Sequence, residues 1–467
     1  MRDFCVKKPT TLQDDITTLA TSLCTRLFPP IDRLKAILKL ALPIIGGMLS
    51  QSLINLVDSA MVGALGSTSL AAAGIGGYAA FVITALILGL SSGVQSTTAF
   101  HFGADCKKSQ VDTLHAGLIL AFLLCLPIII LFYPFIESTL SLLNSNGAVV
   151  ELAIPYLEWR IIALLGVGIN LAFRGYWNGM HHSGIYLKII LLIHLSNILI
   201  SYCLIYGKLG LPAMGVEGAG LGTCISIFSG SLAWFIYTLR KIHRQGFLQR
   251  LPGLPVSWQL LTLSLPNSLQ QTLFAMGYLC LFWIIGLIGP LSLAIGHVLV
   301  NLSLLMILPA VGLGMASTSM VGKALGQEKD HEAQQWGIDV VKVAVALLSL
   351  IAIPLLIFPK EILSLFIIEN SGIEYGAPLL QLTAVMVIID AAAIVLTQAL
   401  LGAGASRLVM IVSVTLQWAL FLPLAFIFGP YLGFGLVGIW AVQLIYRALN
   451  TCTFIWLWRV KAWTIIE

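Results

Sequence analysis

Two amides and one carboxylate lie within one long apolar stretch near the start of the chain, between positions 42 and 66. Gln51, Asn55 and Asp58 are spaced four and three residues apart, so a helix would place them on one face. A carboxylate inside a membrane-spanning helix costs roughly 2.5–3.5 kcal/mol on insertion scales, and such groups usually face a bundle interior or a wet cavity. We therefore expect Asp58 to lie at a functional site.

Three further polar side chains are expected at a similar depth. With a rise of about 1.5 Å per residue, Asp58 lies roughly 12 Å from the outer end of its helix, and Asn197 and Ser201 roughly 15 and 9 Å from theirs. Thr223 lies roughly 8 Å inside the following helix. Carboxylate, amide and hydroxyl oxygens suit Na⁺, and a carboxylate can instead take a proton. These four residues are the predicted coupling site, with H⁺ and Na⁺ both open.

Other polar residues in apolar segments are assigned to a substrate cavity or a secondary site. His194 precedes Asn197 by three residues on the same face and can titrate. Gln51 and Asn55 share the face of Asp58, and Asp390 lies near the middle of a later apolar segment. No nucleophile constellation, phosphate loop or zinc signature occurs, so we expect no catalytic residue and no cofactor besides the coupling ion.

The composition is that of a membrane protein. Of the 467 residues, 58% are hydrophobic and only 10% are charged, whereas soluble domains carry about 25% charged residues. Such a chain stores its apolar surplus in many spanning segments. The net charge of +5 includes no basic run attached to a soluble fold, so nucleic-acid binding is not expected.

The predicted fold class is an all-α polytopic membrane protein with about twelve helices in two six-helix lobes. The apolar segments that we expect to span are 37–64, 70–100, 113–135, 153–175, 184–206, 218–239, 258–288, 293–322, 338–358, 376–402, 408–429 and 435–458. The predicted organisation is an N-terminal tail (1–36), an N-lobe (37–240), a linker (241–257), a C-lobe (258–459) and a C-terminal tail (460–467).

Basic residues predict the orientation of these helices. Alternate loops hold most of the lysines and arginines, while the opposite loops hold little beyond Lys208 and Lys360. Because basic loops stay on the cytoplasmic side, both termini and the linker are expected in the cytoplasm, with the chain in a bacterial inner membrane as a monomer among lipids.

The chain repeats itself at a separation of 223 residues (from Pro43 to Pro266), which becomes shorter near the end of the chain. Leu42-Pro43 recurs as Leu265-Pro266, and three glycines at 89, 103 and 179 recur as glycines at 312, 326 and 402. Because each copy holds about six helices, an even number, both copies enter the membrane the same way, related by an axis along the membrane normal. The acids are not repeated, since Leu281 stands opposite Asp58 and Val167 opposite Asp390.

The segment Asn55-Leu56-Val57-Asp58-Ser59-Ala60-Met61-Val62-Gly63 resembles the first-helix signature of the MATE multidrug and toxic-compound extrusion transporters. Pro43, fifteen residues before Asp58, is similar to a first-helix proline of that family. Tyr156-Leu157-Glu158-Trp159-Arg160 and Gly215-Val216-Glu217-Gly218-Ala219 resemble its DinF-like branch. The resemblance covers roughly residues 37–458.

The resemblance implies two lobes forming a V and exchange of drugs for Na⁺ or H⁺. It implies a cation site at Asp58, Asn197 and Thr223, where Na⁺ could be held, with Pro43 as the hinge of the first helix. The branch has a second aspartate where this chain has Ser201, a departure that weakens Na⁺ binding or favours protons. Asp390 resembles an aspartate of the NorM-like branch, but the glutamate that accompanies it is replaced by Phe274.

The expected function is therefore secondary antiport, not enzyme catalysis: amphipathic, cationic small molecules leave by alternating access in exchange for H⁺ or Na⁺. One alternative is a flippase for a lipid-linked saccharide, for which only Arg160 and Arg447 could supply a basic cavity. A second alternative is a membrane enzyme in which Asp58 and Asp390 bind a metal together. A third is a receptor or scaffold, which the duplicated lobes disfavour.

Overall fold

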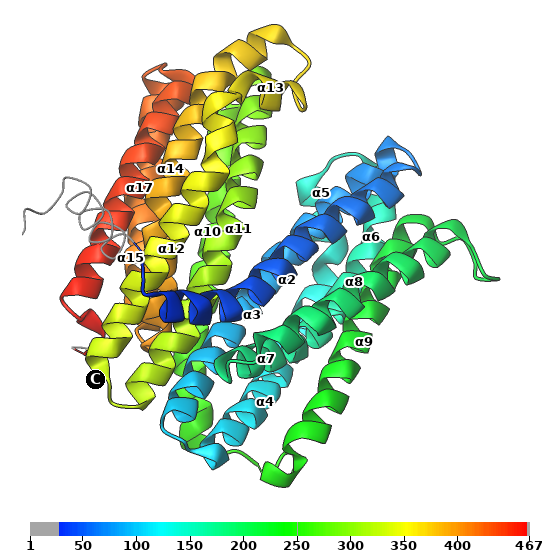
Figure 1. Cartoon of the computed structure of the whole chain (residues 1–467). Helices are drawn as coiled ribbons and strands as arrows, with labels where there is room; N and C mark the ends of the chain where they lie inside the picture. The colour runs from blue at the N-terminus through cyan, green and yellow to red at the C-terminus, as the bar shows by residue number, and fades with distance from the viewer. Residues whose placement is uncertain (1–27, 250, 465–467) are drawn as a thin grey trace, which may run out of the picture.

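The computed structural model describes residues 28–249 and 251–464, and the regular elements in this part of the chain are all helical. Figure 1 shows two groups of helices that lie together at the bottom of the view and diverge toward the top. The group on the right is formed by α2 to α9 and is called the N-lobe; the group on the left, α10 to α17, is called the C-lobe. The predicted all-helical polytopic fold is confirmed.

The N-lobe contains six spanning elements, two of them made of consecutive helices. They are α2 (Ile31–Gly63), α3 (Ser67–Gly103), α4 (Lys107–Phe132) with α5 (Ile136–Leu143), α6 (Gly147–Ile162) with α7 (Leu164–Gly179), α8 (Ser183–Tyr206) and α9 (Gly215–Ile242). The predicted tail before residue 28 lies outside the described residues. The first span was predicted from residue 37, but α2 begins at Ile31, because its polar first turns are helical without being apolar.

The C-lobe repeats this arrangement. It contains α10 (Leu254–Gly286), α11 (Pro290–Gly326), α12 (Asp330–Ile357), the short α13 (Pro359–Ser364), α14 (Asn370–Gly402), α15 (Ser406–Val414) with α16 (Leu422–Phe426) between two π-helical stretches, and α17 (Gly435–Arg459). In the described residues, eleven helices are long and apolar enough to cross a membrane. The predicted twelfth span, 435–458, forms α17, whose Gln443, Arg447 and Asn450 make it more polar.

The predicted span at 153–175 differs from the structure. One long element forms instead from α6 and α7, which meet at Ala163 and extend from Gly147 to Gly179. The residues before the predicted start include the charged Glu151. Its charge interrupts the apolar run, but glutamate is compatible with a helix. Helix boundaries therefore fall outside the apolar run itself.

The sequence repeat places equivalent helices on both sides of the contact between the lobes. Gly89 of α3 lies against the backbone of Ser264 and Ser268 in α10, and Gly312 of α11 lies against the backbone of Ile45 in α2. Ser268 is the repeat equivalent of Ile45, just as Gly312 is the equivalent of Gly89. Since glycine lets two helix backbones approach closely, the repeated glycines mark the axis between the lobes.

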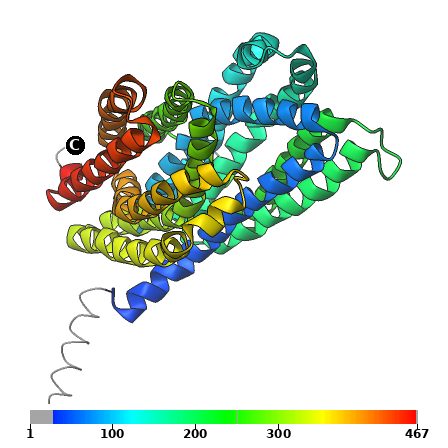
Figure 2. The same ribbon diagram turned by 90° about the horizontal axis from the view of Figure 1, so that it is seen from above.

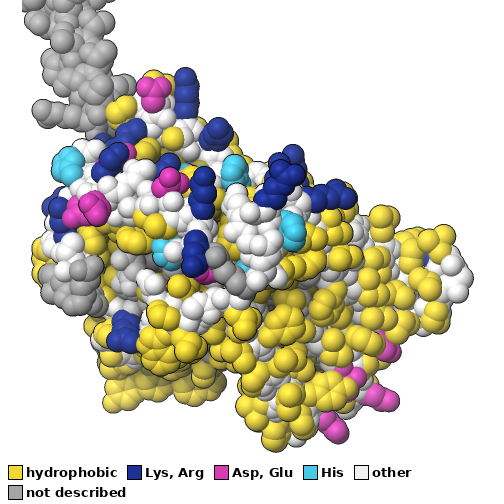
Figure 3. Space-filling model, turned by 90° about the horizontal axis from the view of Figure 1, so that it is seen from below, with side chains coloured by type: hydrophobic (Ala, Val, Ile, Leu, Met, Phe, Trp, Pro, Cys, Tyr) yellow, Lys and Arg dark blue, Asp and Glu magenta, His cyan; other side chains and the backbone are white. Residues whose placement is uncertain are grey.

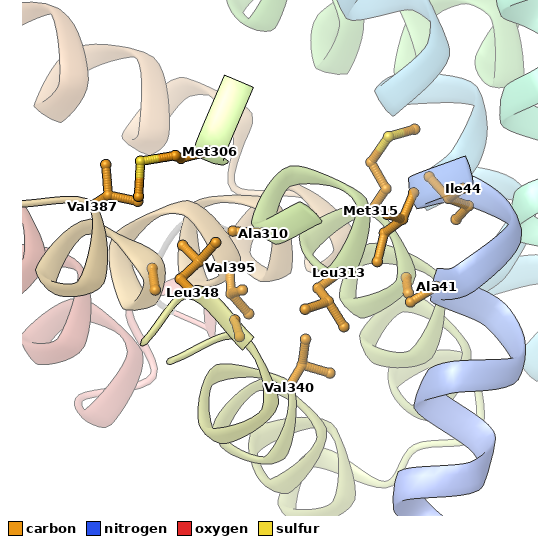
Figure 4. Close-up of a cluster of buried hydrophobic side chains, with 14 of the residues drawn as sticks. Ala41, Ile44, Met306, Ala310, Leu313, Met315, Val340, Leu348, Val387 and Val395 are labelled. Carbon is orange, nitrogen blue, oxygen red and sulfur yellow. The ribbon is translucent and has the colours of Figure 1, made fainter. Parts of the chain in front are cut away.

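Helix α2 belongs to the N-lobe but also packs on the C-lobe. Its start lies beside the yellow-green helices of the C-lobe and its later part beside the green α8, as the view from above shows (Figure 2). In the buried cluster of Figure 4, Ala41 and Ile44 of α2 face Leu313 and Met315 of α11. A displacement of α2 would therefore change helix packing in both lobes.

Lysines and arginines gather at the end of the molecule where the lobes meet. We call it the basic end; it holds the loops that contain Lys107, Lys108, Arg240, Lys329 and Arg459. Figure 3, seen from this end, shows Lys and Arg side chains over much of its upper left part. The alternation predicted from the loops is thus reproduced in three dimensions.

Candidate functional site

Asp58 of α2 and Asn197 of α8 face each other. The amide of Asn197 is satisfied when its nitrogen points to the carboxylate, and it then donates to the two Asp58 oxygens at 2.9 and 3.3 Å. In this orientation the amide oxygen accepts from the hydroxyls of Ser201 and Thr223 at 3.2 and 3.1 Å. The four residues predicted for the coupling site therefore form one hydrogen-bonded cluster, which draws on α2, α8 and α9.

Two glycines of α9 bring the cluster together. A methyl group on Gly218 would lie 2.8 Å from the carbonyl of Leu204, and one on Gly222 would lie 2.8 Å from the Cα of Ser201. Gly218 and Gly222 are four residues apart and so lie on one face of α9. Because neither carries a side chain, α8 approaches closely enough for Asn197 to reach Thr223.

The cluster is buried on the side away from Asp58. Asn197 is 3% exposed and Ser201 0%, whereas Asp58 and Thr223 are half-buried. Among the described residues, neither Asp58 nor Arg160 of α6 takes part in an ion pair. Asp58 is thus the one carboxylate of the cluster and is partly exposed, while its amide partner is held inside the bundle.

A second set of hydrogen bonds extends along the same face of α2. The imidazole Nε2 of His194 lies 3.2 Å from the amide oxygen of Gln51, and the Gln51 nitrogen donates to Asn55 at 3.2 Å. His194 is buried, whereas Gln51 and Asn55 are exposed. These three residues, predicted for a substrate cavity or secondary site, lie on the same two helices as the cluster but make no hydrogen bond to Asp58.

Pro43, the predicted hinge, lies inside α2 and has no backbone N–H to donate. In Figure 1 the first part of α2 runs across the view, and the helix then rises diagonally toward the upper right, beside α8. Bends of this kind in helices almost always occur at proline or glycine, and Gly46 and Gly47 follow Pro43 closely. Its use as a moving hinge stays a prediction.

Asp390 takes no part in this cluster. It lies in α14 of the C-lobe and pairs with Arg447 of α17, whose Nη1 is 2.5 Å from a carboxylate oxygen. Both side chains are largely buried, at 14% and 7% exposure. Asp58 lies in the N-lobe, where it pairs with Asn197 of the same lobe. The alternative of a metal site shared by Asp58 and Asp390 is therefore wrong. The described residues contain no group of three or more His, Cys, Asp or Glu side chains suited to a metal.

Arg447 is the buried partner of Asp390, a role that was not predicted from the sequence, where only its positive charge was considered for a flippase. An arginine inside a spanning helix is itself a signal for a buried partner. Asp390 and Arg447 are 57 residues apart, too far for a helical spacing in the sequence to predict that they form a pair. Their contact depends on how α14 packs against α17.

Two segments of the chain, one in each lobe, match the same family model. This model, MatE, matches residues 43–203 and 266–427, and the second match begins at Pro266, the repeat equivalent of the Pro43 that opens the first. A probable multidrug resistance protein NorM of Synechococcus sp. is 27% identical over 429 residues, covering 88% of this chain and 90% of the relative. Its counterpart of the same name in Thermotoga maritima is 25% identical over 417 residues, covering 87% and 88%.

Solved structures of MATE transporters have the same fold as this chain. A crystal structure of MATE in complex with MaL6 is 25% identical and superposes with a TM-score of 0.84, covering 92% of this chain and 97% of the other. An outward-facing MATE transporter of the MOP superfamily, 24% identical, has the same fold, with a TM-score of 0.85 and coverage of 93% and 97%. The relatives are named NorM, so they support the family without supporting the DinF-like branch. The chain belongs to the MatE family: it is a membrane transporter of the multidrug-extrusion type, an ion-coupled antiporter and not an enzyme.

Proposed function

We propose that this protein exports amphipathic organic cations in exchange for H⁺ or Na⁺, and that Asp58 binds the coupling ion. The contact between Asp58 and Asn197 carries the proposal, because it joins the half-exposed carboxylate of α2 to a buried amide network in α8 and α9. The names of the relatives, multidrug resistance proteins, support the class of substrate.

The amide of Asn197 provides a way for the protein to respond to the ion. When Asp58 is charged, the amide nitrogen faces it. When Asp58 carries a proton or a bound cation, the amide oxygen is the better neighbour, and the nitrogen then donates to Ser201 and Thr223, which lie at 3.2 and 3.1 Å. Because an amide can accept at one end and donate at the other, occupation of Asp58 is transmitted to α9 by a rotation of one side chain.

The single negative charge of the cluster favours H⁺ over Na⁺ as the coupling ion. A site for Na⁺ would consist of the Asp58 carboxylate with oxygens of Asn197, Ser201 and Thr223, which are hard ligands of the right kind. The cluster supplies only one formal negative charge, however, since Ser201 occupies the place of the aspartate in the DinF-like pattern. A single half-buried carboxylate binds a proton without further ligands, so H⁺ is the proposed coupling ion and Na⁺ the alternative.

Coupling requires that the ion favour one arrangement of the lobes. Helix α2 provides the link, because Asp58 near its end contacts α8 while Ile45 packs against Gly312 of the C-lobe. Pro43 and Gly46 in this part of α2 allow the helix to bend. Loss of charge at Asp58 would change the packing of α2 on α8 and thereby shift the contact with α11.

We further propose that the basic end faces the cytoplasm of a bacterial cell and that the transporter acts as a monomer in the inner membrane. The gathering of Lys and Arg at this end supports the orientation. A flippase is not favoured, because Arg447 is already paired with Asp390 and Arg160 alone does not make a strongly basic cavity.

The test is Asp58→Asn, assayed in everted vesicles with a fluorescent cationic dye at matched expression. Asparagine keeps volume and most hydrogen bonding but cannot exchange a proton, and its fixed neutrality should hold the lobes in one arrangement. We expect dye binding to persist and gradient-driven transport to fall to background. Asp105→Asn, an equal change of charge on an exposed loop, is the control. Wild-type transport in Asp58→Asn would overturn the proposal.

A further inference from the structure

A pocket lies at the basic end, on the boundary between the two lobes. Its volume is about 270 Å³. The N-lobe contributes Lys39 of α2 and His181 after α7, and the C-lobe contributes Lys323 of α11 and Trp336 of α12. It is separate from the coupling cluster, which lies near the other end of α2. We call it the boundary pocket.

The boundary pocket has an excess of positive charge. No carboxylate of the described residues lies within ion-pair distance of Lys39 or Lys323. Lys323 is held over the ring of Phe102 at 5.1 Å, so its ammonium group stays near the lobe boundary. Glu332, the acid among the lining residues, is 3.5 Å from Lys329. One uncompensated ammonium group thus comes from each lobe.

The wall formed by Trp336 is fixed by a contact between the lobes. The guanidinium of Arg33 in α2 lies 4.1 Å from the centre of the Trp336 ring and 2.5 Å from the carboxylate of Asp339 in α12. Leu40 and Met320 add apolar lining. The pocket therefore combines two cations, an ordered aromatic wall and an apolar part, and a polar group with an attached apolar chain would match it.

We propose that the boundary pocket binds a phosphate group, which bridges Lys39 and Lys323 and so holds the lobes together at the basic end. A phosphate oxygen accepts strong, charge-assisted bonds from ammonium groups, and basic pockets between membrane helices on the cytoplasmic side bind lipid headgroups. The pocket is large enough for the phosphodiester of an anionic lipid. A free phosphate ion would satisfy the same two lysines, and the experiment separates these sources.

The bridge follows from the charges of the two lobes. Without an anion, Lys39 and Lys323 repel each other across the boundary; with one, each is attracted to the same group. Any ligand that binds only while the lobes are together stabilises that arrangement by mass action. The inference concerns a site that is separate from Asp58, so it stands or fails independently of the proposed coupling reaction.

The experiment measures lipid binding to the full-length purified protein by native mass spectrometry and by thermal stability. The probes are phosphatidylglycerol, phosphatidylcholine, and phosphatidylcholine with inorganic phosphate. We expect bound phosphatidylglycerol and an increase in melting temperature for the wild type, and a loss of roughly fivefold in affinity for either Lys39→Gln or Lys323→Gln. Lys35→Gln, one turn earlier on α2 and exposed, is the matched control and should bind as the wild type does.

Two results would overturn the proposal: undiminished phosphatidylglycerol binding in both variants, or an equal loss in Lys35→Gln, which would indicate general attraction to a basic surface. Stabilisation by inorganic phosphate alone, lost in Lys39→Gln, would support the site and assign it to the free ion. Binding of the coupling ion at Asp58 need not change in any of these variants.

Discussion

Gly103 of α3 and Gly326 of α11 each lie directly against the other's helix. A methyl group on Gly103 would fall on the carbonyl oxygen of Lys323, and one on Gly326 would fall on that of Phe100. The two glycines are equivalent positions of the sequence repeat, so their contacts lie on opposite sides of the axis between the lobes.

The first prediction is that Gly103→Ala or Gly326→Ala impairs transport by forcing the lobes apart at the basic end. The neighbour is backbone and cannot rotate away, so we expect a loss of about 1–3 kcal/mol in stability, or a comparable shift away from the arrangement closed at this end. Thermal stability and dye efflux measure it. Gly74→Ala, where a methyl group meets nothing within 4 Å, should be neutral, and an equal effect of Gly74→Ala would refute the interpretation.

The second prediction concerns the departure at Ser201. Ser201→Asp adds a second charge beside Asn197 and should raise the apparent Na⁺ affinity of efflux at least about tenfold, equivalent to about 1.4 kcal/mol. Ser201→Asn has nearly the same shape without the charge, so it separates electrostatics from crowding against Gly222. Efflux is measured against Na⁺ concentration at constant pH. If the two variants respond equally to Na⁺, the cluster does not bind the ion.

The third prediction is that Asp390 acts chiefly through Arg447. Asp390→Asn leaves the guanidinium buried without its partner, at a cost of about 3–5 kcal/mol, so expression and melting temperature should fall. The double variant Asp390→Asn with Arg447→Met should recover most of the stability. Efflux per folded molecule should then remain ion-coupled. Loss of coupling in the stable double variant, with Asp58→Asn still coupled, would place the ion site in the C-lobe.

The fourth prediction is that Arg33 and Asp339 hold the lobes together at the basic end. Arg33→Asp should destabilise the arrangement closed there by about 1–2 kcal/mol, between the values for exposed and buried pairs. Exchange of the two residues, Arg33→Asp with Asp339→Arg, should restore melting temperature and efflux rate. Lys342→Ala removes a contact to Asp339 within the same helix, at 3.7 Å, and should have little effect. No recovery in the exchanged variant would mean that the pair does not act as a pair.

The sequence by itself determined the class of the molecule, its spanning segments and its duplication. Length, hydropathy and the alternation of basic loops are local or periodic properties, so they can be counted without coordinates. Asp58 was also identified in this way, because an acid in an apolar helix is anomalous wherever the helix packs. Even the depth of Asn197 and Thr223 followed from helix rise, since distance along a helix depends only on residue number.

Only the tertiary structure decided which polar groups meet. The contact of Asp58 with Asn197 joins α2 to α8, two helices far apart in sequence, and depends on the glycines that let α9 approach α8. The pairing of Asp390 with Arg447 and the approach of Lys39 to the pocket of Lys323 depend likewise on how helices cross. Crossing arises from the shape of whole packed surfaces, which no periodic pattern in one segment encodes.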